Sequence, residues 1–217
     1  MSTFKNNKNL YKNLYKKMGI RHKGGIMLSG EPGCGKTSTI MAIATYLGKD
    51  IYYMDLGKIK TNNELKLCID AIKSNNNGAV IIFEDIDCMT NICFENVNVI
   101  DNNIKNDALS LSFLLNVLDG TLSPEDVIFI MTTNHIEKID PALIRPGRMD
   151  LSIEIKKCCR YQLQQIYQDI YDKELRKDIL VKFKEHEFIT AQIILHLFHN
   201  MLNANLSQEE LLKDFLL

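Results

Sequence analysis

The sequence lacks the long apolar segments that place a protein in a membrane. No run approaches the roughly 18–20 apolar residues needed to span a bilayer, and no secretory hydrophobic region is present. The formal net charge of −1 also gives no general reason to expect binding to nucleic acids or anionic membranes. We therefore expect no membrane segment in this chain and no nucleic-acid partner.

A cysteine pattern typical of a metal site is also missing. The six cysteines include no C-x-x-C pair, and Cys88 and Cys93 have no histidine close by in the sequence. Cys158 and Cys159 are adjacent, and Cys34 lies in a glycine-rich stretch. We expect unlinked thiols in a soluble protein of a reducing intracellular compartment, the cytoplasm or the mitochondrial matrix.

Acidic residues are absent before Glu31, whereas residues 1–18 are rich in lysine and asparagine. We interpret this basic arm as a solvated lead-in helix. A mitochondrial presequence and a nucleic-acid contact are the alternatives, although such presequences favour arginine and serine.

The chain does contain a stretch that fits the phosphate-loop pattern G-x-x-x-x-G-K-[ST]. An apolar run over residues 25–29 precedes this loop, and a helical pattern over 38–47, closed by Gly48, follows it. Backbone amides of such a loop bind phosphates, while Lys36 reaches the outer phosphates and the Thr37 hydroxyl holds Mg²⁺. This strand–loop–helix context disfavours the alternative, a glycine turn that binds nothing. The predicted nucleoside triphosphate-binding residues of the loop are Gly30, Glu31, Pro32, Gly33, Cys34, Gly35, Lys36, Thr37 and Ser38.

The rest of the chain divides into an alternating part and a helical part. Apolar runs predict strands over residues 51–56, 79–83, 127–132 and 151–155, the last at a sheet edge. Helices are predicted over 108–118 and from a capping box at Thr61 and Glu64. The face that this second helix buries is predicted as Leu65, Cys68, Ile69 and Ile72. Residues 88–107 are polar and resemble a surface insertion.

From residue 156 the pattern is helical throughout. The predicted buried stripes are Leu163, Ile166, Tyr167 and Ile170, then Leu175, Ile179, Leu180 and Phe183, then Ala191, Ile194, Leu195 and Phe198. Ser207 to Glu210 cap a last helix, and His196 and His199 are expected to be surface or packing residues. The predicted organisation is a basic arm (1–18), an α/β domain (19–156) and a small helical lid (157–217).

Polar residues follow two of the apolar strands, where parallel sheets open to ligands. Glu84 and Asp85 end the 79–83 strand and suit Mg²⁺ binding and polarisation of an attacking water. Asn134 ends the 127–132 strand and is placed to orient that water. Arg145 and Arg148 lie on a Pro-Gly turn and suit contact with phosphates. Each assignment has an alternative: Glu84 and Asp85 could be an ordinary acidic strand end, and Asn134 a turn residue. The two arginines could lie on a solvated loop.

Taken together, these motifs resemble the AAA ATPases. The stretch over residues 140–150, with its Arg145-Pro146-Gly147-Arg148 turn, is similar to that family's second region of homology. Within the family, the motifs around residues 19–24, 84–87 and 114–120 most resemble the mitochondrial chaperone branch that inserts the Rieske iron–sulfur subunit into the cytochrome bc complex. The Glu-Asp order of the acidic pair is a habit of that branch.

The resemblance implies a phosphate-loop NTPase fold with a five-stranded parallel sheet, the Met131 strand lying between the Ile26 and Ile81 strands, and a C-terminal helical lid. It implies that ATP and Mg²⁺ are bound and that arginine fingers act across a homo-oligomeric ring, a hexamer or heptamer, on a protein client. The roles it implies are adenine contact for Gly19 and Ile20, Mg²⁺ binding for Glu84 with Thr37, water activation for Asp85, γ-phosphate sensing for Asn134, and trans fingers for Arg145 and Arg148.

Several features depart from the family pattern. The Rieske-chaperone branch has a membrane helix and a further domain ahead of its ATPase domain, whereas about 24 residues precede the first strand here, so we expect a fragment or a free-standing relative. Residues 57–60 lack the aromatic–apolar–glycine trio of threading unfoldases, and the helical tail has no arginine resembling a second sensor. Asp85 is also one methylene shorter than the usual catalytic glutamate.

The leading hypothesis is an ATP-hydrolysing module that remodels, assembles or translocates proteins. A nucleic-acid motor or loader is an alternative that depends on the basic arm. A nucleotide-binding scaffold with little turnover is another, suggested by the swapped acidic pair. A small-molecule kinase is disfavoured, because it would have no need of trans-acting arginines.

Overall fold

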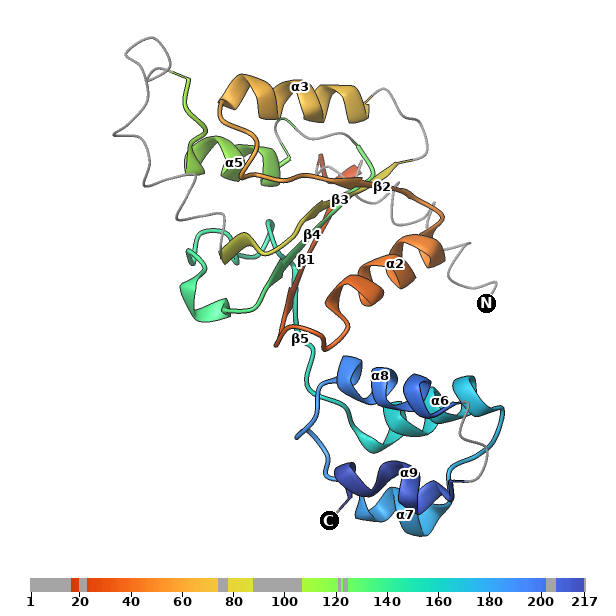
Figure 1. Ribbon diagram of the computed structural model, residues 1–217. Helices are drawn as coiled ribbons and strands as arrows, with labels where there is room; N and C mark the ends of the chain where they lie inside the picture. The colour runs from red at the N-terminus through yellow and green to blue at the C-terminus, as the bar shows by residue number, and fades with distance from the viewer. Residues whose placement is uncertain are drawn as a thin grey trace. The chain divides into compact units, whose positions relative to one another are not determined.

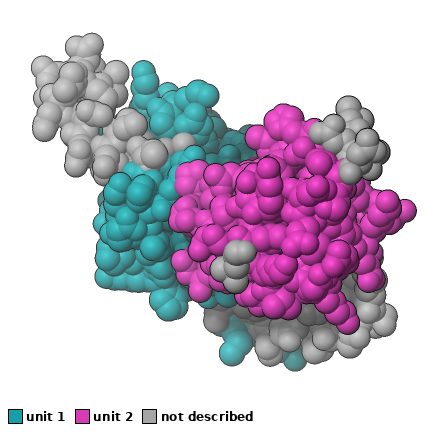
Figure 2. Space-filling view, turned by 60° about the horizontal axis from the view of Figure 1, so that its bottom comes forward, with its two compact units in different colours: residues 1–29, 40–153 teal, residues 30–39, 154–217 magenta. Residues whose placement is uncertain are grey.

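The computed structural model describes residues 17–19, 23–73, 78–87, 107–120, 122, 125–201 and 206–216. Most of the basic arm, Ile20 and residues 88–106 of the proposed insertion lie outside them. The described residues fall into two compact units (Figure 2). One holds those up to Ser29 and from Ile40 to Ile153, and the other holds Gly30–Thr39 and those from Glu154 onward.

The first unit is built on a five-stranded parallel sheet in the order β2-β3-β4-β1-β5 (Figure 1). The strands are β1 (Lys23–Ser29), β2 (Asp50–Tyr53), β3 (Ala79–Phe83), β4 (Val127–Thr133) and β5 (Leu151–Glu154). This order confirms the prediction that the Met131 strand lies between the Ile26 and Ile81 strands, and it confirms β5 as an edge strand. β2 is shorter than predicted, because the chain turns after Tyr53 although Met54 and Leu56 remain buried.

Helices cover both faces of the sheet. Figure 1 shows α3 (Asn62–Lys73) and α5 (Leu111–Leu118) over one face and α2 (Lys36–Leu47) over the other. Side chains alternate along each strand, so Ile81 and Phe83 of β3 pack in the core with α3 and α5, whereas Val80 and Ile82 point to the opposite face. All five residues of β3 are buried, as the continuous apolar run predicts.

Two helix predictions in this unit need correction. The capping box of α3 is confirmed, since Thr61 and Glu64 bond each other's backbone amides, but only Leu65, Ile69 and Ile72 are buried and Cys68 is exposed. The α5 helix begins at Leu111 and not at residue 108. Its N-cap is Ser110, whose hydroxyl accepts a hydrogen bond from the Phe113 amide, while Ala108 forms an isolated bridge with Thr61.

The second unit is helical apart from the glycine-rich loop. It contains α6 (Arg160–Tyr171), α7 (Lys177–Lys182), α8 (Thr190–Asn200), α9 (Gln208–Leu212) and the 3₁₀ turn η3 (Lys213–Phe215). The predicted cap of the last helix is confirmed, because Ser207 and Glu210 form a capping box. Leu163, Tyr167, Leu175, Ile179 and Phe183 are buried as predicted, whereas Ile166, Ile170 and Leu180 are only partly buried against this core.

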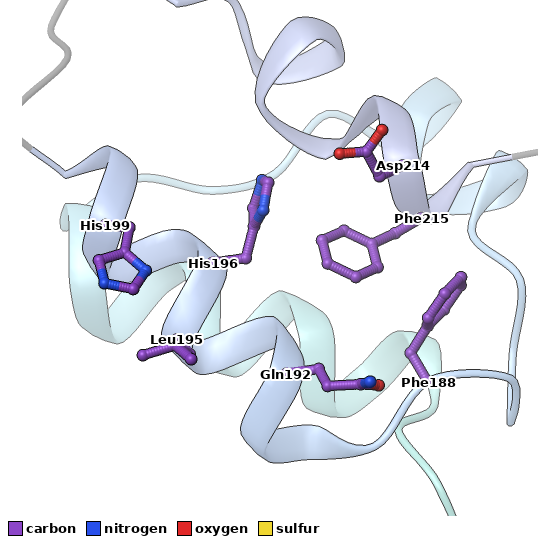
Figure 3. A pocket seen from close by; sticks show the side chains of 7 residues that line it. All are labelled: Phe188, Gln192, Leu195, His196, His199, Asp214 and Phe215. Carbon is purple, nitrogen blue, oxygen red and sulfur yellow. The ribbon is translucent and has the colours of Figure 1, made fainter.

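The predicted face of α8 is wrong. Ile193 and Leu197 are its buried residues, whereas Leu195 and Phe198 are 58% and 56% exposed. Apolar residues cover a wide arc of this helix, so their spacing could not select which part of that arc is buried. Leu195 instead lines an open hollow beside η3 (Figure 3). There the His196 Nε2 donates to the Leu211 carbonyl and the ring packs edge-on against Phe215, as expected for a packing histidine.

No helix within the described ranges is long and apolar enough to cross a membrane. The described cysteines, Cys34, Cys68, Cys158 and Cys159, are free thiols.

Candidate active site

The glycine-rich loop leads from the end of β1 into α2 and adopts backbone angles that favour glycine. Gly33 and Gly35 have φ values of +80° and +105°. Lys36 is buried, and its Nζ donates to the carbonyls of Gly30 and Glu31 at 2.7 and 3.2 Å. Thr37 and Ser38 are exposed in the first turn of α2. The loop thus has its lysine folded back across its own backbone and two hydroxyl residues at a helix N-terminus.

Within the second unit this loop packs on α8. The Ala191 amide donates to the Gly33 carbonyl at 3.1 Å, and a Cβ on Gly33 would come 3.0 Å from the Ile189 Cδ1. A Cβ on Gly30 would approach the Ile155 carbonyl oxygen to 2.3 Å. Both positions have a positive φ that favours glycine, and at Gly30 the backbone clash excludes any larger residue.

The side chains around the loop are charged or sulfur-containing. Glu31 forms an ion pair with Lys157 at 3.1 Å, and Pro32 beside it is exposed. Cys34 is buried, and this burial, together with the nearby Glu31 carboxylate, raises the pKa of its thiol. The Cys34 side chain is therefore a protonated packing group and not an activated nucleophile.

The structure brings Asp85 and Asn134 together in the first unit. They follow β3 and β4, which are parallel neighbours, so their carboxyl ends meet at one edge of the sheet. The Asn134 Nδ2 donates to the Asp85 Oδ1 at 3.3 Å, and Asp85 is exposed with Glu84 half-buried beside it. Asp85 has a left-handed backbone conformation, φ +48°, and its amide donates to the Thr132 Oγ1 at 3.0 Å.

A third carboxylate at this sheet edge, that of Asp87, has no role in the sequence-based prediction. Asp87 is only 5% exposed, and its Oδ1 accepts hydrogen bonds from the Thr133 hydroxyl at 2.7 Å and the Asn134 amide at 3.2 Å. Burial acts to raise the pKa of Asp87, but these hydrogen bonds outweigh it and hold the pKa below its ordinary value. The only feature of the sequence that could have indicated this residue is its position, two residues after the acidic pair that ends the apolar run.

The two arginines of the 140–150 loop have different surroundings. Arg145 is exposed. Arg148 forms a two-pronged ion pair with Asp119, Nε to Oδ1 at 2.7 Å and Nη2 to Oδ2 at 2.8 Å, and its Nη1 donates to the Ala142 carbonyl. The hydrogen bonds from Arg148 lower the pKa of Asp119. Arg148 is thus held within its own unit, whereas Arg145 is presented to solvent.

The loop that carries these arginines is anchored to β1. The Asp150 amide donates to the Gly25 carbonyl at 2.9 Å, and the Gly25 amide donates to the Asp150 carboxylate at 3.1 Å. The other oxygen of the Asp150 carboxylate accepts from the Gly147 amide, and the Lys23 Nζ donates to the carbonyls of Gly147 and Leu118. Sequence reasoning assigned no role to Lys23, Gly25 or Asp150.

The remaining predicted residues give less information. Gly19 is exposed with φ +67°, and Ile20 lies outside the described residues, so adenine contact by this pair stays a prediction. Thr37, Glu84 and Asp85 supply the hard oxygen donors that Mg²⁺ prefers. Among the described residues, no group of three or more histidine, cysteine or acidic side chains forms a cation site by itself.

Comparison with known proteins assigns the family. Residues 26–157 match the model of the ATPase family associated with various cellular activities (AAA). The chain is 35% identical over 221 residues to the Arabidopsis thaliana AAA-ATPase At3g28600, a match that covers 94% of this chain and 45% of that protein. AAA-ATPase At3g50940 from the same plant is 36% identical over 187 residues, covering 84% of the chain and 41% of the relative. The chain spans less than half the length of these curated relatives. It belongs to the AAA family of ATPases.

Proposed function

We propose that this chain binds ATP with Mg²⁺ and hydrolyses it. Family membership supports the proposal, because the relatives are named as ATPases. The observation that carries it is the pairing of Asp85 with Asn134 at 3.3 Å, at the ends of two adjacent parallel strands. In a chain that also has a phosphate loop, an acid and an amide held together at this edge suit the positioning of an attacking water.

In the proposed reaction the phosphate loop binds the triphosphate through its amides. Lys36, which now contacts the loop carbonyls, would exchange these for phosphate oxygens. Asp85 accepts a proton from water while the water oxygen bonds to the γ-phosphorus, and the bond from that phosphorus to the bridging oxygen breaks to release ADP. Asn134 orients the water through its side-chain amide.

Thr37 and Glu84 are the residues proposed to hold Mg²⁺, with Asp85 contributing through the water shell. A cation of this kind usually takes one or two carboxylates and completes its shell with water and substrate phosphates. When bound, it neutralises the charge that develops on the phosphate oxygens.

We further propose that each site is completed by a neighbouring copy in a hexameric or heptameric ring. Arg145 supports this proposal, because its side chain is exposed, as contact with a second chain requires. Arg148 could act in the same way only by leaving Asp119. The energy of hydrolysis would be used to remodel, assemble or translocate a protein client. Residues 57–60 lack the aromatic–apolar–glycine trio of threading unfoldases, which argues against a threaded client.

The test is the rate of ATP hydrolysis per chain, measured as a function of protein concentration. We expect a specific rate that rises with concentration, because sites completed between copies form only on association. Size-exclusion chromatography at the same concentrations should show the oligomer forming over the same range. Lys36→Ala is the control that removes nucleotide binding.

Two results would contradict parts of the proposal. A measurable rate that stays constant while the chain remains a monomer would exclude completion in trans. Nucleotide binding without any turnover would contradict ATP hydrolysis and favour the alternative, a nucleotide-binding scaffold.

A further inference from the structure

Four hydrogen bonds join the ends of β3 and β4 beyond the sheet itself. On one side the Asp85 amide donates to the Thr132 Oγ1 at 3.0 Å. On the other side the Thr133 hydroxyl donates to the Asp87 carboxylate at 2.7 Å. Successive side chains of a strand point to opposite faces, so the segment after β3 holds the end of β4 from both faces.

Asp85 and Asp87 accept hydrogen bonds from different parts of Asn134. Its side-chain amide donates to the exposed Asp85, whereas its backbone amide donates to the buried Asp87. The first contact must break if Asn134 is to turn toward a substrate, but the second can persist. Asp87 therefore restrains the backbone of Asn134 and leaves its side chain able to rotate.

The surroundings of Asp87 make a purely space-filling role a poor explanation. The residue is 5% exposed, and burying a carboxylate is costly unless hydrogen bonds compensate. A neutral residue would fill the same space at lower cost. Two hydrogen-bond partners of this carboxylate lie at the end of β4, one at Asn134 itself and one at the residue before it.

We infer that Asp87 is a positioning residue for ATP hydrolysis. It fixes the backbone of Asn134 so that the side-chain amide of Asn134 faces Asp85. This inference rests on the proposed function, since it assumes that Asp85 and Asn134 act on the attacking water. Asp87 is assigned no direct contact with substrate or metal. Its contribution lies in keeping the acid and the amide in one geometry.

The experiment compares Asp87→Ala and Asp87→Asn with the unaltered full chain. We expect Asp87→Ala to lower kcat by about 10- to 100-fold, because small misplacement of catalytic groups has effects of this size. The dissociation constant of a fluorescent ADP analogue should change by less than about twofold, because the phosphate loop is untouched. Asp87→Asn should recover most of kcat, since its Oδ1 can accept the same two hydrogen bonds.

Hydrogen exchange of the peptide that covers residues 132–136 gives a readout independent of turnover. Loss of the Asp87 carboxylate should speed exchange of the Asn134 amide in Asp87→Ala and not in Asp87→Asn. The matched control is Asp70→Ala, which removes an exposed carboxylate from α3 and should leave kcat and this exchange unchanged.

Three results would overturn the inference. They are a wild-type kcat in Asp87→Ala, a folded Asp87→Asn with no recovery, and a parallel loss of nucleotide binding and thermal stability in both variants. If Asp87→Ala does not fold, Thr133→Val replaces it, with Thr133→Ser as its hydroxyl-retaining control and the same expected effect on kcat. If the unaltered chain hydrolyses no ATP, the proposed function fails on its own. Unchanged exchange of the Asn134 amide in Asp87→Ala would separately refute the restraint of the Asn134 backbone by Asp87.

Discussion

Asp119, the residue that follows α5, holds both nitrogens of one edge of the Arg148 guanidinium at 2.7 and 2.8 Å. Lys23 of β1 reaches the carbonyls of Leu118 and Gly147, the residues just before each member of this pair. The end of α5, the start of β1 and the arginine loop are therefore joined by charged groups. These contacts give the loop that carries Arg145 a fixed base.

This ion pair should make stability depend on pH. The pKa of Asp119 is lowered in the folded chain, so its contribution is present above the unfolded pKa of about 3.9 and is lost as pH falls through the folded value. We expect Asp119→Asn to lose about 0.5–1 kcal/mol of stability near neutral pH and less at about pH 3, the small size reflecting partial exposure. Urea unfolding across this range measures it.

Arg148→Ala provides the check on this assignment. It should remove the same part of the pH dependence, and the double variant should cost less than the two single changes added together. Additive effects would show that the two side chains do not stabilise each other.

Substitution of Gly25 should detach the arginine loop. A Cβ at this position would lie 1.7 Å from the Arg148 carbonyl oxygen, too close for any adjustment short of moving the backbone. We expect Gly25→Ala to destabilise the chain by about 3 kcal/mol or more. Gly24→Ala is the matched control, because its Cβ would come no closer than 4.0 Å to Ile128. Equal thermal unfolding midpoints for the two variants would contradict the close packing of β1 on this loop.

Much of the sheet is predictable because local pattern and burial agree. Five consecutive apolar residues between a turn-prone stretch and two acids predict β3 with the bounds that the structure shows. Once β4 lies beside β3, Asp85 and Asn134 must be neighbours, although 49 positions separate them. The site at this edge thus follows from strand ends and strand order.

Other contacts leave no trace in local sequence. Asp119 and Arg148 are 29 positions apart, and the same Pro-Gly turn could equally have exposed both arginines. The face of α8 was mispredicted because the apolar residues from Ile193 to Phe198 cover a wide arc of the helix, of which only Ile193 and Leu197 are buried. The role of Asp87 depends on the direction of its carboxylate, which only the fold determines.

The finger assignment of Arg145 can be tested by mixing two inactive chains. Arg145→Ala should keep nucleotide affinity and lose hydrolysis, whereas Lys36→Ala should lose nucleotide binding. In a mixed ring the Lys36→Ala chain can supply Arg145 to the intact loop of its neighbour. We therefore expect the mixture to hydrolyse ATP faster than the sum of the two separate preparations. Activity that stays at that sum, with mixed oligomers demonstrated, would exclude action in trans.

Separate changes to Asp85 and Glu84 should show which acid activates water. The Asp85 carboxylate accepts a hydrogen bond from the Asn134 side-chain amide and is proposed to accept the proton of the attacking water. Asp85→Asn should therefore reduce kcat by about 100-fold or more while ATP still binds. Glu84→Gln should instead raise the Mg²⁺ concentration needed for half-maximal activity, since Glu84 is assigned to the metal. Rates measured over a Mg²⁺ titration distinguish the two effects. If Glu84→Gln abolishes turnover at saturating Mg²⁺ and Asp85→Asn merely shifts the titration, the two roles are exchanged. Full activity in Asp85→Asn would leave the Asp85–Asn134 pair without a part in hydrolysis.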